Sequence, residues 1–307
     1  MTKTTRSCCL IVCIALISWF MFAESVFAAY PTDPTSDTGW PYSSENSIAA
    51  IQTRFNTARA HENSQLGTSV PMMTLPSQQE WNNLTDTEKA LWLINRERED
   101  RGVAPLHGLE SNVEGVAQYY AQYLLDNNVF GHYEDGNSPW ERLDDNPAIG
   151  ACYDFLNVSE NLAVLWGGWT LPIERAVYMW MYDDSSSSWG HRHAILWYPY
   201  NDNGGLAGRE GFLGIGRATG PHQGWSNSDI IVMNVFDPCA SWDYGPTALL
   251  GDITGDGEVD LTDAMTALQI MIGTETGPVV LDGDVNGDLK IGLAEALFAL
   301  RKMAGLH

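Results

Sequence analysis

The chain is short of basic residues. It has 16 lysines and arginines against 39 aspartates and glutamates in 307 residues, a formal net charge of -23. Such a charge repels phosphate backbones and anionic lipid surfaces, so we expect no nucleic acid partner, whereas multivalent cations suit it. Hydrophobic residues amount to 44% and charged residues to only 18%. This excludes a wholly disordered or fibrous chain and leaves room for one sizeable core and a smaller unit.

The chain also lacks a hydrophobic run long enough to span a membrane. An apolar stretch over residues 8–22 follows Lys3 and Arg6 and precedes the small residue Ala28. This pattern predicts a cleaved secretory signal over residues 1–28, because a spanning helix needs about 20 apolar residues. An uncleaved anchor is the alternative. We therefore expect a secreted, extracellular or cell-surface protein with no membrane span after signal cleavage.

Cysteine is scarce outside the signal. Of five cysteines, only Cys152 and Cys239 remain after cleavage. In an oxidising compartment this predicts a disulfide between them, with two buried free thiols or a redox site as the alternatives. Neither has a second cysteine within a few residues, which argues against a CxxC pair or a zinc–thiolate cluster.

The composition divides the mature chain into three regions. Residues 29–83 are rich in Ser, Thr, Pro, Asn and Gln, which predicts an irregular arm with at most one short helix. Residues 84–245 show helical periodicity first and short β-branched runs later, which predicts an α+β domain. Phe298 is the single aromatic residue beyond Tyr244, so we place a boundary there and treat residues 246–307 as a separate unit.

The last region repeats itself at a constant offset. The recurring residues are Gly251, Asp252, Gly255, Asp256, Leu261, Ala264, Ala267, Leu268 and Gly273, which return as Gly283, Asp284, Gly287, Asp288, Leu293, Ala296, Ala299, Leu300 and Gly305. A duplication this regular indicates two copies of one structural unit.

Each copy places oxygen ligands at the spacing of a calcium-binding loop. The first loop offers Asp252, Thr254, Asp256, the carbonyl of Glu258, Asp260 and Asp263, and the second offers Asp284, Asn286, Asp288, the carbonyl of Lys290 and Glu295. Alternate residues of a tight loop supply the hard oxygens that calcium needs, so the sequence predicts calcium in this region. We expect the second site to be weaker, because Leu289 replaces the usual glycine.

An apolar helix pattern follows each loop, and none precedes it. This arrangement resembles the type I dockerin modules of bacterial secreted proteins, over about residues 251–305. The resemblance implies a small all-α, two-loop EF-hand-like domain that docks onto a cohesin-like or other cell-surface protein. A calcium-stabilised tail without a partner is the alternative.

Five blocks occur in order in the central region. They are LWLINREREDRGVAPL (Leu91 to Leu106), FGHYEDGNSPWERL (Phe130 to Leu143), SENLA (Ser159 to Ala163), WGHRHAIL (Trp189 to Leu196) and FLGIGRA (Phe212 to Ala218). Together they resemble the CAP superfamily of cysteine-rich secretory, antigen 5 and pathogenesis-related proteins, especially its bacterial SCP-like branch, over about residues 84–244. The resemblance implies a three-layer α-β-α sandwich with a cleft that carries two histidines and two acids.

The resemblance assigns four cleft residues by motif. They are His132, Glu160, His191 and a second acid three residues after Trp180, which is Asp183. Such a set suits zinc or another divalent ion, an activated water, or a purely hydrogen-bonded cluster. If His191 began a strand, His193 would share its face; a packing role for His193 is the favoured alternative.

Three functions fit these observations. The favoured one is a secreted binding module that holds a metal or a small apolar or peptide-like ligand and is tethered by the calcium-binding tail. The second is a divalent-metal-dependent, peptidase-like hydrolase with Glu160 as the base. The third is a structural envelope protein. We favour a binding module over an enzyme, because no GxSxG nucleophile motif occurs and the resemblance implies no established reaction.

Overall fold

The computed structural model describes residues 30–41, 45–150, 157–198, 211–237, 251–254, 258–274, 283–285 and 290–304. The predicted signal, both cysteines of the predicted disulfide, and three predicted calcium ligands lie outside the described residues; those ligands are Asp256, Asn286 and Asp288.

A four-stranded sheet forms the centre of the fold, in the order β1-β3-β4-β2. The strands are β1 (Gly108–Leu109), β2 (Asn157–Trp166), β3 (Phe212–His222) and β4 (Trp225–Asp237). Strand β4 pairs antiparallel with both β2 and β3, and β1 adds a short parallel pair to β3. The short β-branched runs late in residues 84–245 thus form the neighbouring strands β3 and β4. Strand β2 was not predicted, because its first half carries the polar side chains of the SENLA block.

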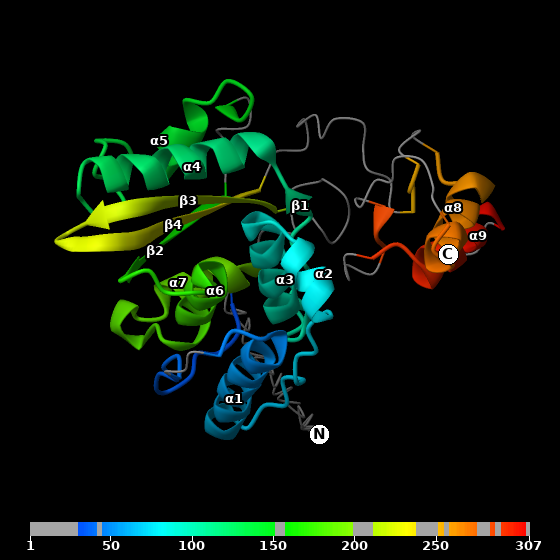
Figure 1. Cartoon of the computed structure of the whole chain (residues 1–307), viewed down its shortest axis with the longest axis horizontal. Helices are drawn as coiled ribbons and strands as arrows, with labels where there is room; N and C mark the ends of the chain where they lie inside the picture. The colour runs from blue at the N-terminus through cyan, green and yellow to red at the C-terminus, as the bar shows by residue number, and fades with distance from the viewer. Residues whose placement is uncertain are drawn as a thin grey trace, which may run out of the picture.

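Helices cover both faces of the sheet (Figure 1). On one face, α4 (Ser111–Asp126) packs Ala117, Tyr120 and Leu124 against Leu162 and Val232 of the sheet. On the other face, α3 (Asp86–Glu99), α6 (Pro172–Tyr182) and α7 (Gly190–Leu196) share one core with Ile231, Met233 and Val235 of β4. Short α5 (Pro139–Asp144) and the 3-10 turn η2 (Ser185–Ser187) complete this region. The layers confirm the α+β prediction for the central region.

Two glycines of β3 explain how closely α4 approaches the sheet. A Cβ on Gly214 would lie 2.4 Å from the backbone N of Glu114, and one on Gly216 would lie 2.2 Å from the carbonyl carbon of Ala117. Only glycine fits where a helix backbone rests directly on a strand. The GxG of the FLGIGRA block is therefore a packing requirement.

The N-terminal arm is more ordered than its composition predicts. It contains α1 (Ile48–Leu66) and α2 (Gln78–Asn83), and α1 is 19 residues long rather than a short helix. Ile51 and Phe55 of α1 are fully buried in the core shared with α3 and α6. Glu62, also on the buried side of α1, bonds to Arg101 at 2.5 Å and to Arg192 at 2.7 Å. The sequence pattern predicted too short a helix here, because part of the buried face of α1 carries charged residues.

The tail contains α8 (Leu261–Met271) and α9 (Leu293–Met303), one after each loop of the repeat. The two loops start side by side, since the N–H of Gly251 donates to the carbonyl of Gly283 at 2.9 Å. Nowhere in the described ranges is a helix both long and apolar enough to cross a bilayer.

Candidate functional site

The first histidine–carboxylate pair joins the loop after α4 to β2. Nδ1 of His132 lies 2.9 Å from Oε1 of Glu160. Nη2 of Arg142, on α5, donates to both oxygens of Glu160 at 2.9 and 2.8 Å, and the amide of Asn234 adds a bond at 3.3 Å. The Glu160 side chain is buried, and Arg142 offsets its charge. Glu160 therefore holds the His132 ring in one orientation.

Tyr120 of α4 positions the loop that carries His132. Its hydroxyl donates to the carbonyl of Gly131 at 2.5 Å and accepts from the N–H of Glu134 at 3.1 Å. Burial raises the pKa of Tyr120 to about 12, so the hydroxyl keeps its proton and remains a donor at neutral pH. Its ring lies under Arg142, with the guanidinium carbon 3.5 Å from the ring centroid.

The second pair lies at the start of α7. Nδ1 of His191 is 2.6 Å from Oδ1 of Asp184. The other oxygen of Asp184 accepts the backbone N–H groups of His191 and Arg192 at 2.9 and 3.2 Å. Asp184 is buried, so one carboxylate both caps the helix start and fixes the imidazole ring.

The acid beside His191 is Asp184 and not Asp183, the residue that the motif spacing indicated. Helix α6 ends at Tyr182, and Asp183 is its C-cap with φ −129° and ψ 53°. Because the chain leaves the helix there, counting three residues from Trp180 no longer leads to the acid that contacts His191. Burial, together with the charges of Asp37 and Asp184, raises the pKa of Asp183.

His193 belongs to a different contact. His191 lies in a helix and not at the start of a strand, so His193 is turned by roughly 200° around α7. Its Nε2 lies 2.7 Å from Oδ2 of Asp33, and its ring stacks on Tyr30 with centroids 3.5 Å apart. This is the packing role that the sequence favoured.

Strand β2 links the two histidine–carboxylate pairs. Glu160 and Asn161 are consecutive residues, so their side chains leave opposite faces of the strand. Glu160 holds His132, while Nδ2 of Asn161 donates to the carbonyl of His191 at 2.9 Å. In the part of the chain that the structure describes, no three His, Cys, Asp or Glu side chains converge as metal ligands. The four side chains thus form two pairs instead of one four-ligand set.

Comparison with known proteins shows a similarity in the central segment. Residues 91–206 match the CAP family model, the cysteine-rich secretory protein family. This segment is CAP-like. No curated protein matches the chain. A solved structure, that of an outer surface protein from Borrelia burgdorferi, is similar at 22% sequence identity over 50% of this chain and 92% of its own, with a TM-score of 0.34. Both histidines and Glu160 lie inside the CAP segment, residues 91–206.

The pairs in the CAP segment suit a metal held by histidines alone. In each pair, Nδ1 is engaged by a carboxylate, which leaves Nε2 as the ligand atom, and metal-binding histidines are usually oriented in this way. The oxygens of Glu160 and Asp184 already accept bonds from Arg142 and from backbone N–H groups. Each histidine would therefore offer Nε2 to an ion, and its carboxylate would orient the ring.

Sequence reasoning missed Arg142, Tyr120 and Asp184. Arg142 stands inside a quoted block, but nothing in the order of residues shows that its side chain returns to Glu160, 18 positions later. Tyr120 looks like an ordinary core residue of an amphipathic helix. Asp184 was visible only as the neighbour of Asp183.

The repeat in the tail is structural as well as sequential. In the first loop, Asp263 accepts from the N–H groups of Ile253 and Asp260, both at 2.8 Å. In the second loop, Glu295 accepts from the corresponding positions, Val285 at 3.3 Å and Gly292 at 2.7 Å. Asp252, Asp263, Asp284 and Glu295 are all buried. Nζ of Lys290 lies 3.1 Å from Oε1 of Glu80, so this side chain pairs with α2.

Proposed function

We propose that the protein is an extracellular binding module whose cleft holds zinc or another divalent ion through Nε2 of His132 and Nε2 of His191. The main support for this proposal is that a buried carboxylate fixes each imidazole ring through Nδ1. The side chains of His132 and His191 remain 38% and 26% exposed, so the ion could be reached from solvent. A bound ion with open positions supplies Lewis acidity to a polar group of a ligand.

The geometry favours binding over hydrolysis. The candidate base Glu160 has both oxygens bonded to Arg142 and its side chain is buried. A general base must reach the proton that it removes, and Glu160 reaches only His132, Arg142 and Asn234 among the described residues. We therefore assign Glu160 an orienting role.

The test is a calorimetric titration of the full chain with zinc. We expect binding in the wild type, weaker binding at acid pH because imidazole binds metal only when neutral, and loss of binding in the His132→Ala/His191→Ala double variant. His61→Ala, which removes an exposed histidine of α1 outside the cleft, is the control. Unchanged zinc affinity in the double variant would reject the site.

We further propose that the tail binds calcium and tethers the protein to a partner. Support comes from an apolar face that the repeat duplicates. Leu261, Met265 and Leu268 of α8 correspond in the repeat to Leu293, Leu297 and Leu300 of α9, and all six are 42% to 54% exposed. Exposed apolar patches of this kind mark interaction surfaces.

A binding measurement tests the tether. An immobilised type I cohesin module should capture the full chain in calcium and release it in chelator. Met265→Glu together with Leu297→Glu should abolish capture. Capture that depends neither on calcium nor on these two residues would reject this docking surface. Zinc binding by His132 and His191 should be the same in either case.

A further inference from the structure

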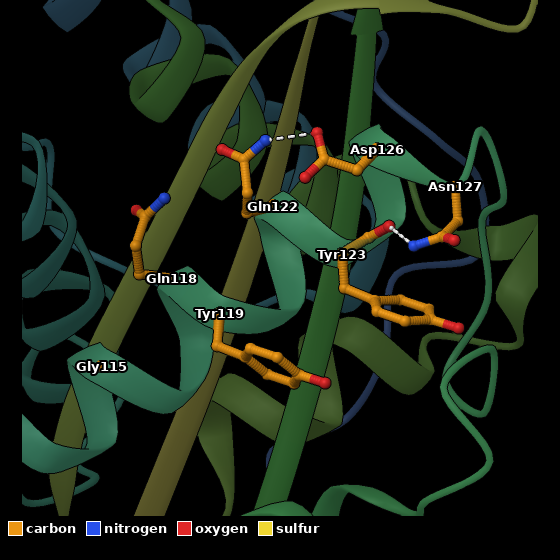
Figure 2. A pocket seen from close by; sticks show the side chains of 7 residues that line it. All are labelled: Gly115, Gln118, Tyr119, Gln122, Tyr123, Asp126 and Asn127. Atoms are coloured by element: carbon orange, nitrogen blue, oxygen red, sulfur yellow. Dashed lines mark hydrogen bonds between the residues drawn. The ribbon is translucent and has the colours of Figure 1, made fainter.

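Helix α4 has a second organised face, opposite the one that packs on the sheet. Gly115, Tyr119 and Tyr123 follow one another at intervals of four residues, and Gln122 and Asp126 form a parallel row (Figure 2). Side chains four residues apart lie one above the other on a helix. These residues border an open pocket of about 480 Å³, a volume typical of small-ligand sites.

The aromatic row pairs an exposed ring, Tyr119, with a half-buried one, Tyr123, whose hydroxyl donates to the carbonyl of Glu134 at 3.1 Å. Tyr119 is 55% exposed, and its ring centroid lies 6.3 Å from that of Tyr123, with the planes inclined by 40°. Both rings extend to the same side of the helix (Figure 2). The face of an aromatic ring is electron-rich, so it attracts weakly polarised C–H groups.

Gly115 has no structural reason to be glycine. It lies inside α4, where the backbone is helical, and a Cβ added there would meet no atom within 4 Å. Glycine in a helix interior is destabilising relative to alanine. Neither packing nor backbone conformation therefore explains a glycine at this position. Because Gly115 has no side chain, the pocket extends past Tyr119 over the backbone of α4.

The second row is polar and held in place. Nε2 of Gln122 donates to Oδ1 of Asp126 at 2.7 Å. The amide of Gln118, at the head of this row, bonds to the backbone N–H and carbonyl of Arg217 at 2.9 and 3.0 Å. Each amide keeps further hydrogen-bonding capacity. Asp126 is the one charged side chain among the described residues that line the pocket, which disfavours anionic ligands.

We propose that this face of α4 binds a neutral glycan chain, a function beyond the histidine cleft. The C–H face of a sugar ring would rest on Tyr119 and Tyr123, and its hydroxyls would bond to the amide row. A protein partner is the weaker fit, because a stable interface needs about 800 Å² on each side and this pocket is lined by one helix.

A neighbouring pocket favours a chain over a single sugar. It also measures about 480 Å³ and shares Gln118 with the first pocket; its other lining residues are Thr85, Asp86, Thr87, Glu114, Ile215, Arg217 and Thr219. Arg217 is paired with Asp86 and Asp229, so its charge is offset. An elongated ligand could pass from the tyrosines across Gln118 to these hydroxyl and carboxylate groups.

The test titrates the full chain with three neutral hexasaccharides: cellohexaose, xylohexaose and mannohexaose. We expect at least one to bind. Tyr119→Ala should lower that affinity by about tenfold or more. Gly115→Ala should lower it too, while raising Tm by a few degrees because alanine favours the helix. Tyr198→Ala, which truncates an exposed tyrosine outside both pockets, should change neither quantity.

Gly115→Ala should weaken sugar binding and raise Tm. These opposite effects distinguish a binding role of this face from a purely structural one. Absence of binding by all three sugars at millimolar concentration would overturn it. The proposal would also be overturned if Tyr119→Ala and Gly115→Ala both left the affinity for the sugar unchanged. A polyproline peptide or phosphatidylcholine vesicles that bound instead of the sugars, and lost binding with Tyr119→Ala, would also overturn it and assign the face to a protein or a membrane.

Discussion

Nη2 of Arg142 lies 2.9 and 2.8 Å from the two carboxylate oxygens of Glu160. Both side chains are buried, so neither charge can be compensated by water. Through this pair, α5 is fixed to β2, and His132 is fixed to Glu160. One ion pair therefore contributes both to the stability of the fold and to the orientation of His132.

Removing Arg142 should leave the buried Glu160 without the guanidinium that offsets its charge. We expect Arg142→Met to destabilise the protein by about 3–5 kcal/mol, since that is the usual cost of breaking a buried pair by deleting one partner. Urea unfolding followed by tryptophan fluorescence measures this. Arg96→Met, which removes half-exposed pairs on α3, should cost no more than about 1 kcal/mol. Equal effects of the two substitutions would contradict the prediction.

The two neighbouring aspartates should differ in their effect on metal binding. Asp184→Asn should weaken zinc binding by about 10–100-fold, because the group that orients His191 loses its charge. Asp183→Asn, its matched control, should leave the affinity unchanged. Zinc titration of both variants decides the matter, and a larger effect at Asp183 would mean that the motif spacing, and not the geometry, identifies the second acid.

Acid should weaken the attachment of the N-terminal arm. Burial alone would raise the pKa of Glu62, but hydrogen bonds and charges from Arg101 and Arg192 lower it from 4.5 to about 2. A pKa that is lower in the folded state adds stability above the unfolded value, and this stability is lost as pH falls from about 4.5 to about 2. Wild-type unfolding free energy should therefore fall across this range.

Glu62→Gln should be less stable at neutral pH and should show a shallower fall in acid. Chemical denaturation at several pH values measures both effects. The exposed residue Glu134 supplies the control, Glu134→Gln, which should retain the wild-type slope. An unchanged slope in Glu62→Gln would show that other carboxylates carry the acid sensitivity.

Calcium removal should unfold the tail alone. At a concentration about 100 times Kd, each bound ion adds about 2.7 kcal/mol to a folded unit, and so small a unit has little core of its own. In chelator we expect lower helical circular dichroism, with unchanged tryptophan fluorescence, because all 12 tryptophans precede the tail. Identical helical melting with and without calcium would exclude this dependence.

Patterns within a few neighbouring residues were sufficient to predict the helices and the repeat, because interactions between near neighbours determine them. The helical periodicity early in residues 84–245 appears as α3 and α4, and Thr85 and Glu88 form a capping box at the start of α3. The repeat of the tail reappears as matching contacts of Asp263 and Glu295. Periodicity predicted only a short helix where α1 lies, because buried Arg59 and Glu62 give the end of its inner face a polar composition.

The sequence by itself determined the order of the regions, the acidic character, the repeat, and His132, Glu160 and His191 as the residues to consider. Only the tertiary structure decided that Asp184 serves His191, that Arg142 neutralises Glu160, and that the tyrosines of α4 border a pocket. The reason is physical. Helix periodicity and caps arise from interactions within a few residues, whereas a buried charge acquires its partner from wherever the packed chain brings one close.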